Sequence, residues 1–189
     1  MIQTAACEDM SAVVNIAEAV RINPYDPDPH ILNKGFLVYV LGKNGYRRRE
    51  NPYFTLSSEG GAAAGFLMCY NCAFLRELVA DGSISHQDGA VSFLLREIEC
   101  PFLFGDQIAV SSTVSRRGIG RELMHDMFGR MHAAGIRRMY VTILHRPVRN
   151  AASIQFCEGL GAKCVQEVTN KDGFTWGVYF FEQELTHTP

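Results

Sequence analysis

The sequence predicts a mixed α/β (α+β) fold in which helices flank one central sheet. Apolar runs typical of strands alternate along the chain with segments whose apolar residues recur at helical spacing. Two pairs of apolar runs are separated by short glycine-containing turns, which is typical of β-hairpins. The chain has 189 residues, 47% of them hydrophobic, which is enough to build one sizeable core. We therefore expect a single domain over residues 1–189.

The first half of the chain is expected to hold a helix, a proline-rich break, a hairpin and two more helices. Met10 and Val13 recur at helical spacing, and three prolines within residues 23–29 end that helix. Gly60-Gly61 separates the two runs of the hairpin. The expected elements are a strand over residues 2–7, a helix over 8–21, an apolar run of undecided type over 36–41, strands over 52–59 and 62–70, and two helices within 74–99.

The second half contains the clearest helix of the chain. Leu123, Met127 and Met131 share one face of this helix, and Gly135 ends it. Asn150 is a typical N-cap for the helix that follows the next strand. The expected elements are a strand over residues 107–112, a helix over 120–134, a strand over 138–144, a helix over 150–160, and strands over 162–168 and 174–181.

The charge balance argues against two classes of partner. Eighteen Lys and Arg residues against twenty Asp and Glu residues give a formal net charge of -2, so bulk charge favours neither nucleic-acid nor anionic-membrane binding. No apolar stretch approaches the ~18 residues that a membrane span needs. The first residues lack the basic and apolar regions of a signal peptide. We therefore expect a cytoplasmic protein.

The six cysteines are expected to be reduced thiols in that compartment. Only Cys69 and Cys72 have a suggestive spacing, and a zinc site would need a second ligand pair that the sequence lacks. The pair ends an apolar run that is typical of a strand, which favours structural thiols over redox chemistry. His125 and His132 share a helix face without a third ligand, so no metal site is expected. Redox or metal chemistry at the cysteine pair stays an alternative.

The most informative segment is the glycine turn between the strand over residues 107–112 and the helix that follows. Gly118 and Gly120 allow backbone N–H groups to approach a ligand, and the positive end of the helix dipole favours an anion there. Arg116, Arg117 and Arg121 add full charges, so a pyrophosphate fits this turn. The dinucleotide fingerprint Gly-x-Gly-x-x-Gly is not met, because position 123 is Leu.

A second segment, residues 150–162, begins 30 residues beyond Gly120. Together the two segments resemble the GNAT superfamily of acyl-CoA-dependent N-acetyltransferases. Residues 110–121 are similar to its pyrophosphate-binding motif (Arg/Gln)-x-x-Gly-x-(Gly/Ala), and residues 150–162 to its motif Asn-x-x-Ala-x-x-(Phe/Leu)-Tyr-x-x-x-Gly-Phe. The resemblance covers residues 105–181 and implies a mostly antiparallel sheet of six or seven strands, splayed at the strands around 108–112 and 139–144.

The resemblance further implies acetyl-CoA as co-substrate and a primary amine as acceptor, with direct attack of the amine on the thioester. Four positions depart from the family pattern: Ser115 replaces the first Arg or Gln, Ser153 replaces a small Ala, Cys157 replaces a Tyr, and Ala162 stands where Phe is common. These departures leave a catalytically weak CoA-binding or regulatory protein as the alternative. The residues that the resemblance assigns to cofactor binding are Val110, Ser112, Ser115, Arg116, Arg117, Gly118, Ile119, Gly120, Arg121, Asn150 and Ser153.

The catalytic groups carry no motif of their own. In many family members the Tyr at the position of Cys157 protonates the departing thiolate, and an ordinary thiol pKa of ~8.5 keeps a cysteine a feasible donor. Protonation by solvent is the alternative. Glu97, Glu99 and Asp106 precede the cofactor strand and are candidates for the general base, against the alternative of ordinary surface carboxylates. The acceptor's identity and a homodimer formed through edge strands both stay open.

Overall fold

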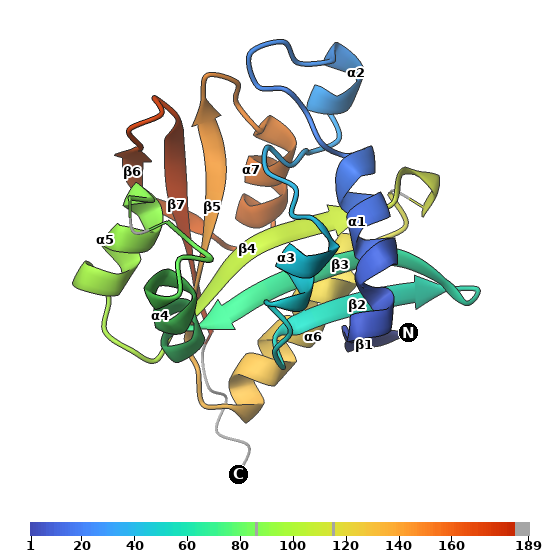
Figure 1. Ribbon diagram of the computed structural model, residues 1–189, viewed down its shortest axis with the longest axis horizontal. Helices are drawn as coiled ribbons and strands as arrows, with labels where there is room; N and C mark the ends of the chain where they lie inside the picture. The colour runs from blue at the N-terminus through green and yellow to red at the C-terminus, as the bar shows by residue number, and fades with distance from the viewer. Residues whose placement is uncertain (86, 115, 184–189) are drawn as a thin grey trace.

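A seven-stranded sheet forms the centre of the protein, in the order β1-β2-β3-β4-β5-β7-β6 (Figure 1). The structure is a computed structural model that describes residues 1–85, 87–114 and 116–183. Neighbouring strands are antiparallel except β4 and β5, which are parallel. The strands are β1 (Ile2–Thr4), β2 (Phe54–Glu59), β3 (Ala62–Asn71), β4 (Leu103–Val110), β5 (Arg138–Arg146), β6 (Lys163–Thr169) and β7 (Thr175–Glu182). The predicted mixed α/β sheet flanked by helices is therefore confirmed.

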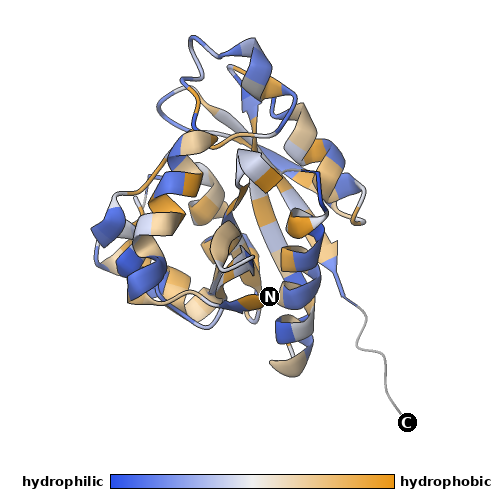
Figure 2. Ribbon diagram, turned by 90° about the vertical axis from the view of Figure 1, so that its right-hand side faces the viewer, coloured by the Kyte–Doolittle hydropathy of each residue, from blue (hydrophilic) through white to orange (hydrophobic). Residues whose placement is uncertain are grey.

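Helices cover both faces of the sheet. Apolar residues of α1, α3, α4 and α5 pack in one cluster, and those of α6 and α7 pack in a second cluster on the other face. Apolar and polar segments alternate along these helices, as expected of helices that are half-buried (Figure 2). The helices are η1 (Cys7–Asp9), α1 (Met10–Ala19), α2 (Pro29–Leu32), α3 (Lys43–Arg47), α4 (Cys72–Ala80), α5 (Gly89–Glu97), η2 (Ser112–Val114), α6 (Ile119–Ala133) and α7 (Ala151–Glu158).

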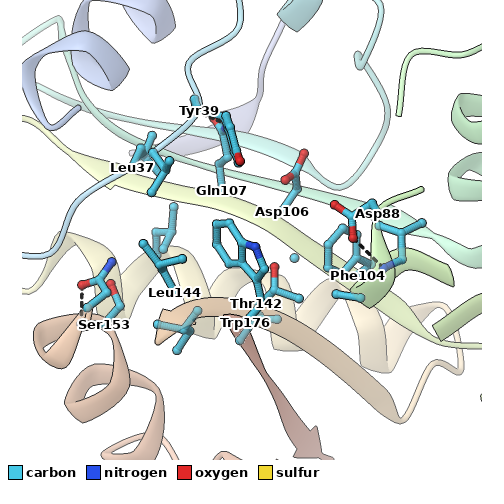
Figure 3. A pocket seen from close by; sticks show the side chains of 18 of the residues that line it. Leu37, Tyr39, Asp88, Phe104, Asp106, Gln107, Thr142, Leu144, Ser153 and Trp176 are labelled. Atoms are coloured by element: carbon cyan, nitrogen blue, oxygen red, sulfur yellow. Dashed lines mark hydrogen bonds between the residues drawn. The ribbon is translucent and has the colours of Figure 1, made fainter. Parts of the chain in front are cut away.

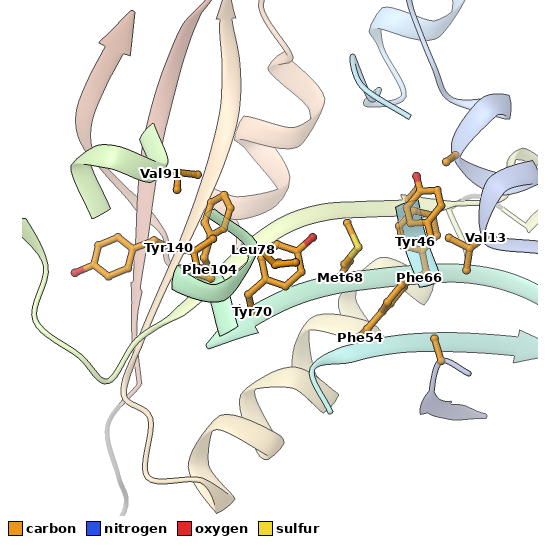
Figure 4. Close-up of a cluster of buried hydrophobic side chains, with 14 of the residues drawn as sticks. Val13, Tyr46, Phe54, Phe66, Met68, Tyr70, Leu78, Val91, Phe104 and Tyr140 are labelled. Atoms are coloured by element: carbon orange, nitrogen blue, oxygen red, sulfur yellow. The ribbon is translucent and has the colours of Figure 1, made fainter. Parts of the chain in front are cut away.

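The larger cluster is built around aromatic rings that meet edge to face or at a tilt (Figure 4). Tyr46 from α3 and Phe66 from β3 meet edge to face with ring centroids 5.8 Å apart, and Phe54 from β2 lies 6.0 Å from Phe66. All three rings have no exposed surface. Truncating one of these rings to Ala typically costs about 3–5 kcal/mol, so this cluster fixes the sheet rigidly under the site.

The two central strands separate part-way along their length. β4 and β5 pair only at Leu103↔Met139, Phe104↔Tyr140 and Gly105↔Val141, and beyond these positions they diverge (Figure 1). At the same point β4 carries a bulge against β3, since Met68 pairs with Gln107 and Cys69 pairs with Gly105. Asp106 is the extra residue of the bulge. A bulge bends a strand and turns a side chain to a new direction, so it accounts for both the splay and the direction of Asp106.

Most elements match the sequence prediction, and four segments differ from it. The apolar run over residues 36–41 forms neither strand nor helix, apart from an isolated bridge between Arg21 and Leu37. The short helices α2 and α3 were not expected. β4 begins at Leu103 instead of at residue 107, because its first residues form the short ladder with β5.

The cysteines correct one expectation. Cys72 forms a disulfide with Cys100, so these two are not reduced thiols, and Cys72 does not pair with Cys69. Cys72 is the first residue of α4, at the strand-to-helix junction that a thioredoxin-like pair would need, but Cys69 is a fully buried side chain of β3 whose thiol pKa is raised by burial.

Among the described residues, no group of three His, Cys, Asp or Glu side chains has the arrangement of a metal site. Within the same residues, no helix has the length and apolar character that a membrane span requires.

Candidate active site

Two cavities meet where β4 and β5 separate. The first, of about 620 Å³, lies between the glycine turn before α6 and residues 33–36, and we call it the glycine-turn cavity. The second, of about 510 Å³, lies between β4, β5 and residues 36–41, and we call it the carboxylate cavity. Phe36, Ile108, Ser153 and Phe156 line both. The two cavities therefore adjoin at these four residues, in the gap between the strands.

The glycine-turn cavity brings together most of the residues that the sequence assigned to a cofactor. Its wall also contains Asn33 and Lys34, which the sequence analysis did not select. The predicted residues that line it are Val110, Ser112, Arg116, Gly118, Ile119, Gly120, Arg121 and Ser153. Ser115 lies outside the described residues.

The turn itself has the backbone of an anion site. Gly118 is the N-cap of α6 with φ +85°, a left-handed conformation that favours glycine, and as a glycine it has no side chain with which to cap the helix. Arg116 also has a left-handed φ, of 66°. The first N–H groups of the 15-residue helix α6 have no intrahelical partner and carry the positive end of its dipole. Together with the guanidinium groups of Arg116 and Arg121, they favour a phosphate.

Two of the predicted residues are used differently. Arg117 lines neither cavity, and its Nη1 lies 3.1 Å from Oε1 of Glu59 in an exposed ion pair. Asn150 is buried; its Oδ1 accepts a hydrogen bond from the Ser153 backbone N–H at 3.3 Å, and its Nδ2 donates to the Phe36 carbonyl at 3.0 Å. Asn150 therefore caps α7 and ties the segment around Phe36 to this helix.

The carboxylate cavity takes its name from Asp106 and Asp88 (Figure 3). The Tyr70 hydroxyl donates to Asp106 Oδ2 at 2.7 Å. Burial raises the pKa of Asp106, while the Tyr70 hydrogen bond and the nearby Arg49 guanidinium oppose that rise. Asp88 caps α5 by accepting from the Val91 N–H at 3.0 Å, and burial raises its pKa as well. The cavity therefore presents carboxylates whose proton affinity is above the ordinary range.

A hydrogen-bond chain holds residues 36–41 over this cavity. The Tyr46 hydroxyl donates to Gln107 Oε1 at 2.8 Å, and Gln107 Nε2 donates to the Tyr39 carbonyl at 2.9 Å. Gln107 follows the bulge residue on β4 and is itself buried. This apolar segment is thus fixed as a cavity wall by side-chain bonds instead of a sheet ladder, which explains why its type was not readable from hydropathy.

Comparison with known proteins agrees with this arrangement. A model of the "Acetyltransferase (GNAT) family" matches residues 12–162. The chain belongs to the GNAT acetyltransferase family. No curated protein sequence matches it. Among solved structures it is similar to Ard1 from Thermoplasma volcanium, with a TM-score of 0.67 and 13% identity over 97% of this chain and 98% of that one.

Two further structures share the GNAT fold at low identity. The ribosomal-protein-S18-alanine N-acetyltransferase of Escherichia coli has a TM-score of 0.63 and 12% identity, covering 100% of this chain and 96% of its own. An N-acetyltransferase of Staphylococcus aureus has a TM-score of 0.56 and 19% identity, with 98% of each chain covered. At these identities the likeness shows the fold, and the site has to be argued from this chain.

The three predicted catalytic residues of this GNAT chain lie in different surroundings. Asp106 faces the carboxylate cavity. Cys157 lines the same cavity and is 6% exposed, and burial raises its thiol pKa to about 12. Glu99 lines neither cavity; it precedes β4 at the paired end of the two strands, where its carbonyl accepts from Arg138 Nη2 at 2.7 Å.

Sequence reasoning missed several residues of the GNAT site. Tyr70, Gln107 and Trp176 were assigned to the core or not selected, because each lies in an apolar strand where a polar group looks incidental. The three residues share one feature that could have identified them: each has a hydrogen-bonding side chain within a buried strand. A buried polar side chain of this kind needs a hydrogen-bond partner. Tyr70 and Gln107 have such partners in the protein, whereas Trp176 Nε1 is buried without one among the described residues.

Proposed function

We propose that the protein is an acetyl-CoA-dependent N-acetyltransferase that moves the acetyl group to a primary amine by direct attack. The observation that carries the proposal is the meeting of the two cavities in the gap between β4 and β5. One cavity suits a pyrophosphate and the other suits a cation. The thioester would lie at their junction, beside Ile108, Ser153 and Phe156.

The glycine-turn cavity would hold acetyl-CoA. The unpaired N–H groups at the start of α6 and the Arg116 and Arg121 guanidinium groups would bind the pyrophosphate. The pantetheine arm would lie in the gap along β4, where Val110 and Ile108 are not paired with β5. A backbone N–H of this stretch would polarise the thioester carbonyl, and a donor of that kind is typically worth 10²–10³ in rate.

The carboxylate cavity would hold the amine and its base. The ammonium form binds near Asp106, loses its proton to that carboxylate directly or through water, and then attacks the carbonyl carbon. A C–N bond forms and the C–S bond breaks, so CoA leaves as a thiolate. Because burial raises the pKa of Asp106, this carboxylate is a stronger base than an ordinary aspartate.

The thiolate would take its proton from solvent. Cys157 lines the carboxylate cavity, but with a thiol pKa of about 12 it is a weaker acid than the CoA thiol that would form when it protonates the departing thiolate. Cys157 is thus better suited to packing beside the substrates than to donating a proton. The raised pKa therefore argues against Cys157 as the acid, a role that the ordinary pKa of a thiol had allowed.

The test is the release of CoA from acetyl-CoA in the presence of a panel of small primary amines. We expect amine-dependent release that Asp106→Asn lowers by about 10² or more, a typical contribution of a general base. Glu99→Gln is the matched control, because it removes a carboxylate that lines neither cavity, and it should keep the rate. Binding of acetyl-CoA with no release for any amine would instead support the CoA-binding or regulatory alternative.

A further inference from the structure

The outer end of the carboxylate cavity carries a cluster of aromatic rings. Tyr39 stacks on Trp176 with ring centroids 6.1 Å apart, and Phe174 lies 6.2 Å from Tyr39 and 6.4 Å from Trp176. Tyr25 joins them, with its ring 5.6 Å from that of Phe174. Tyr39 and Trp176 line the cavity, and Tyr39 remains 51% exposed. Exposed and half-buried ring faces of this kind attract cations.

Carboxylates surround the same end. Asp172, in the turn between β6 and β7, accepts a hydrogen bond from the Tyr39 hydroxyl at 3.1 Å, and Asp88 lies in the cavity wall. The two carboxylates are close enough for Asp172 to contribute to the raised pKa of Asp88, after burial. Asn170 Oδ1 accepts from the Gly89 N–H at 2.9 Å and so fixes this turn against the start of α5.

The charges are unevenly distributed along the cavity. The one cationic lining residue, Arg49, lies toward the inner end, where it interacts with Asp106 and donates to the carbonyls of Gly45 and Ser83. Asp88 lines the outer end, whereas Asp172 and the neighbouring Lys171 do not line the cavity; Asp172 lies beside it, against the Tyr39 hydroxyl. Negative charge at the outer end therefore has no positive partner among the described lining residues.

Two buried donors belong to the wall of this cavity. Trp176 Nε1 and Arg49 Nε are buried and have no hydrogen-bond partner among the described residues, and both residues line this cavity. Arg49 is 5% exposed. Trp176 extends from β7 between Leu144 and Thr142 toward Gln107 and Asp106 (Figure 3). An N–H donor is satisfied by an acceptor, such as a carbonyl or hydroxyl oxygen or water, and not by an ammonium group, so these two donors do not bear on the charge of the ligand.

We propose that the acceptor is a linear amine with a second positive charge. Its reacting amino group would lie at the junction near Asp106, and its second cation would lie at the outer end between Asp88, Asp172 and the rings of Tyr39 and Trp176. This inference rests on the proposed function for the reacting end. The cation site at the outer end stands on the rings and carboxylates alone.

The kinetic test compares three probes of equal chain length: diaminobutane, butylamine and aminobutanol. We expect kcat/KM for diaminobutane to exceed that for the other two by about tenfold, which corresponds to one partly shielded ion pair with an aromatic neighbour. Asp172→Asn should bring the ratio of kcat/KM for diaminobutane to kcat/KM for butylamine toward one. The Asn side-chain oxygen can still accept from the Phe174 N–H, so the turn should be kept. Asp88→Asn should act in the same direction, because Asn is an equally good N-cap for α5.

Glu182→Gln is the matched control. It removes one exposed carboxylate at the far end of β7, next to Arg138 on β5, and should leave the ratio unchanged.

A binding test does not depend on turnover. Trp176 is the chain's single tryptophan, so its fluorescence reports on this cavity alone. With CoA present, diaminobutane should change the emission at a concentration about tenfold lower than butylamine does, and Asp172→Asn should remove that difference. Equal affinities and equal kcat/KM for the two amines, or no binding of either, would overturn the inference. Preferred binding of diaminobutane without acetylation would support the cation site and refute the proposed acetyl transfer.

Discussion

Asn150 offers a quantitative test of how the site is held together. Its side chain makes two buried hydrogen bonds, one to the Ser153 N–H at the start of α7 and one to the Phe36 carbonyl. Replacing it by Ala removes a helix cap, which costs about 1 kcal/mol, and leaves a carbonyl without its donor, which costs about 1–3 kcal/mol. We therefore expect Asn150→Ala to lower the free energy of unfolding by about 2–4 kcal/mol.

A second substitution separates the two contributions. Asn150→Ser keeps a side-chain oxygen at the N-cap of α7 but loses the Nδ2 donor to Phe36, so it should cost about 1–3 kcal/mol through the carbonyl alone. The measurement is urea denaturation of the three proteins, with midpoints and slopes compared. Acetyl-CoA affinity should fall in both variants, because Phe36 lies in the wall of the glycine-turn cavity.

The opposite pattern would refute the reasoning. If Asn150 acts by direct contact with the co-substrate, Asn150→Ala will keep its stability within about 0.5 kcal/mol of the parent, the range of an ordinary surface change, and lose affinity only. A stability loss without any change in acetyl-CoA affinity would instead show that the segment around Phe36 does not shape the cavity.

Three further predictions concern single side chains. Alanine at Arg116 or Arg121 should weaken acetyl-CoA binding by about tenfold or more in calorimetric titration, while Arg117→Ala should stay near the parent because its partner is Glu59; equal losses for all three would contradict the assignment. Cys157→Ala should leave kcat unchanged from neutral to alkaline pH, and a drop at the pH values where the thiol is protonated would restore it as the acid. In a pH profile, kcat/KM should fall toward acid as the Asp106 carboxylate is protonated, with a midpoint above the ordinary value of ~3.9, and Asp106→Asn should abolish that limb.

The order of elements was predictable because hydropathy and glycine turns mark it directly. The hairpin around Gly60-Gly61, the helix with Leu123 and Met127, and the turn with Gly118 are all in the structure as expected. These features depend on residues a few positions apart. Residues close together in the sequence are therefore enough to predict the order of elements and the glycine turn.

The carboxylate cavity was less predictable because it depends on contacts between distant segments. Asp106 was selected, but only the bulge opposite Met68 and Cys69 shows why its side chain faces the cavity. Residues 36–41 are a wall only because Gln107, far along the chain, holds Tyr39 in place. The disulfide between Cys72 and Cys100 equally depends on the return of the chain at β4 and not on spacing.

The central claim is that the two cavities share one reaction centre between β4 and β5. The most direct measurement is calorimetric titration with a bisubstrate analogue in which an acetyl bridge joins the sulfur of CoA to diaminobutane. We predict that it binds about a hundredfold or more tightly than CoA alone, because joining the two ligands makes the second binding event intramolecular. Binding no tighter than that of CoA would contradict the claim, since the amine would then have no place beside the thioester.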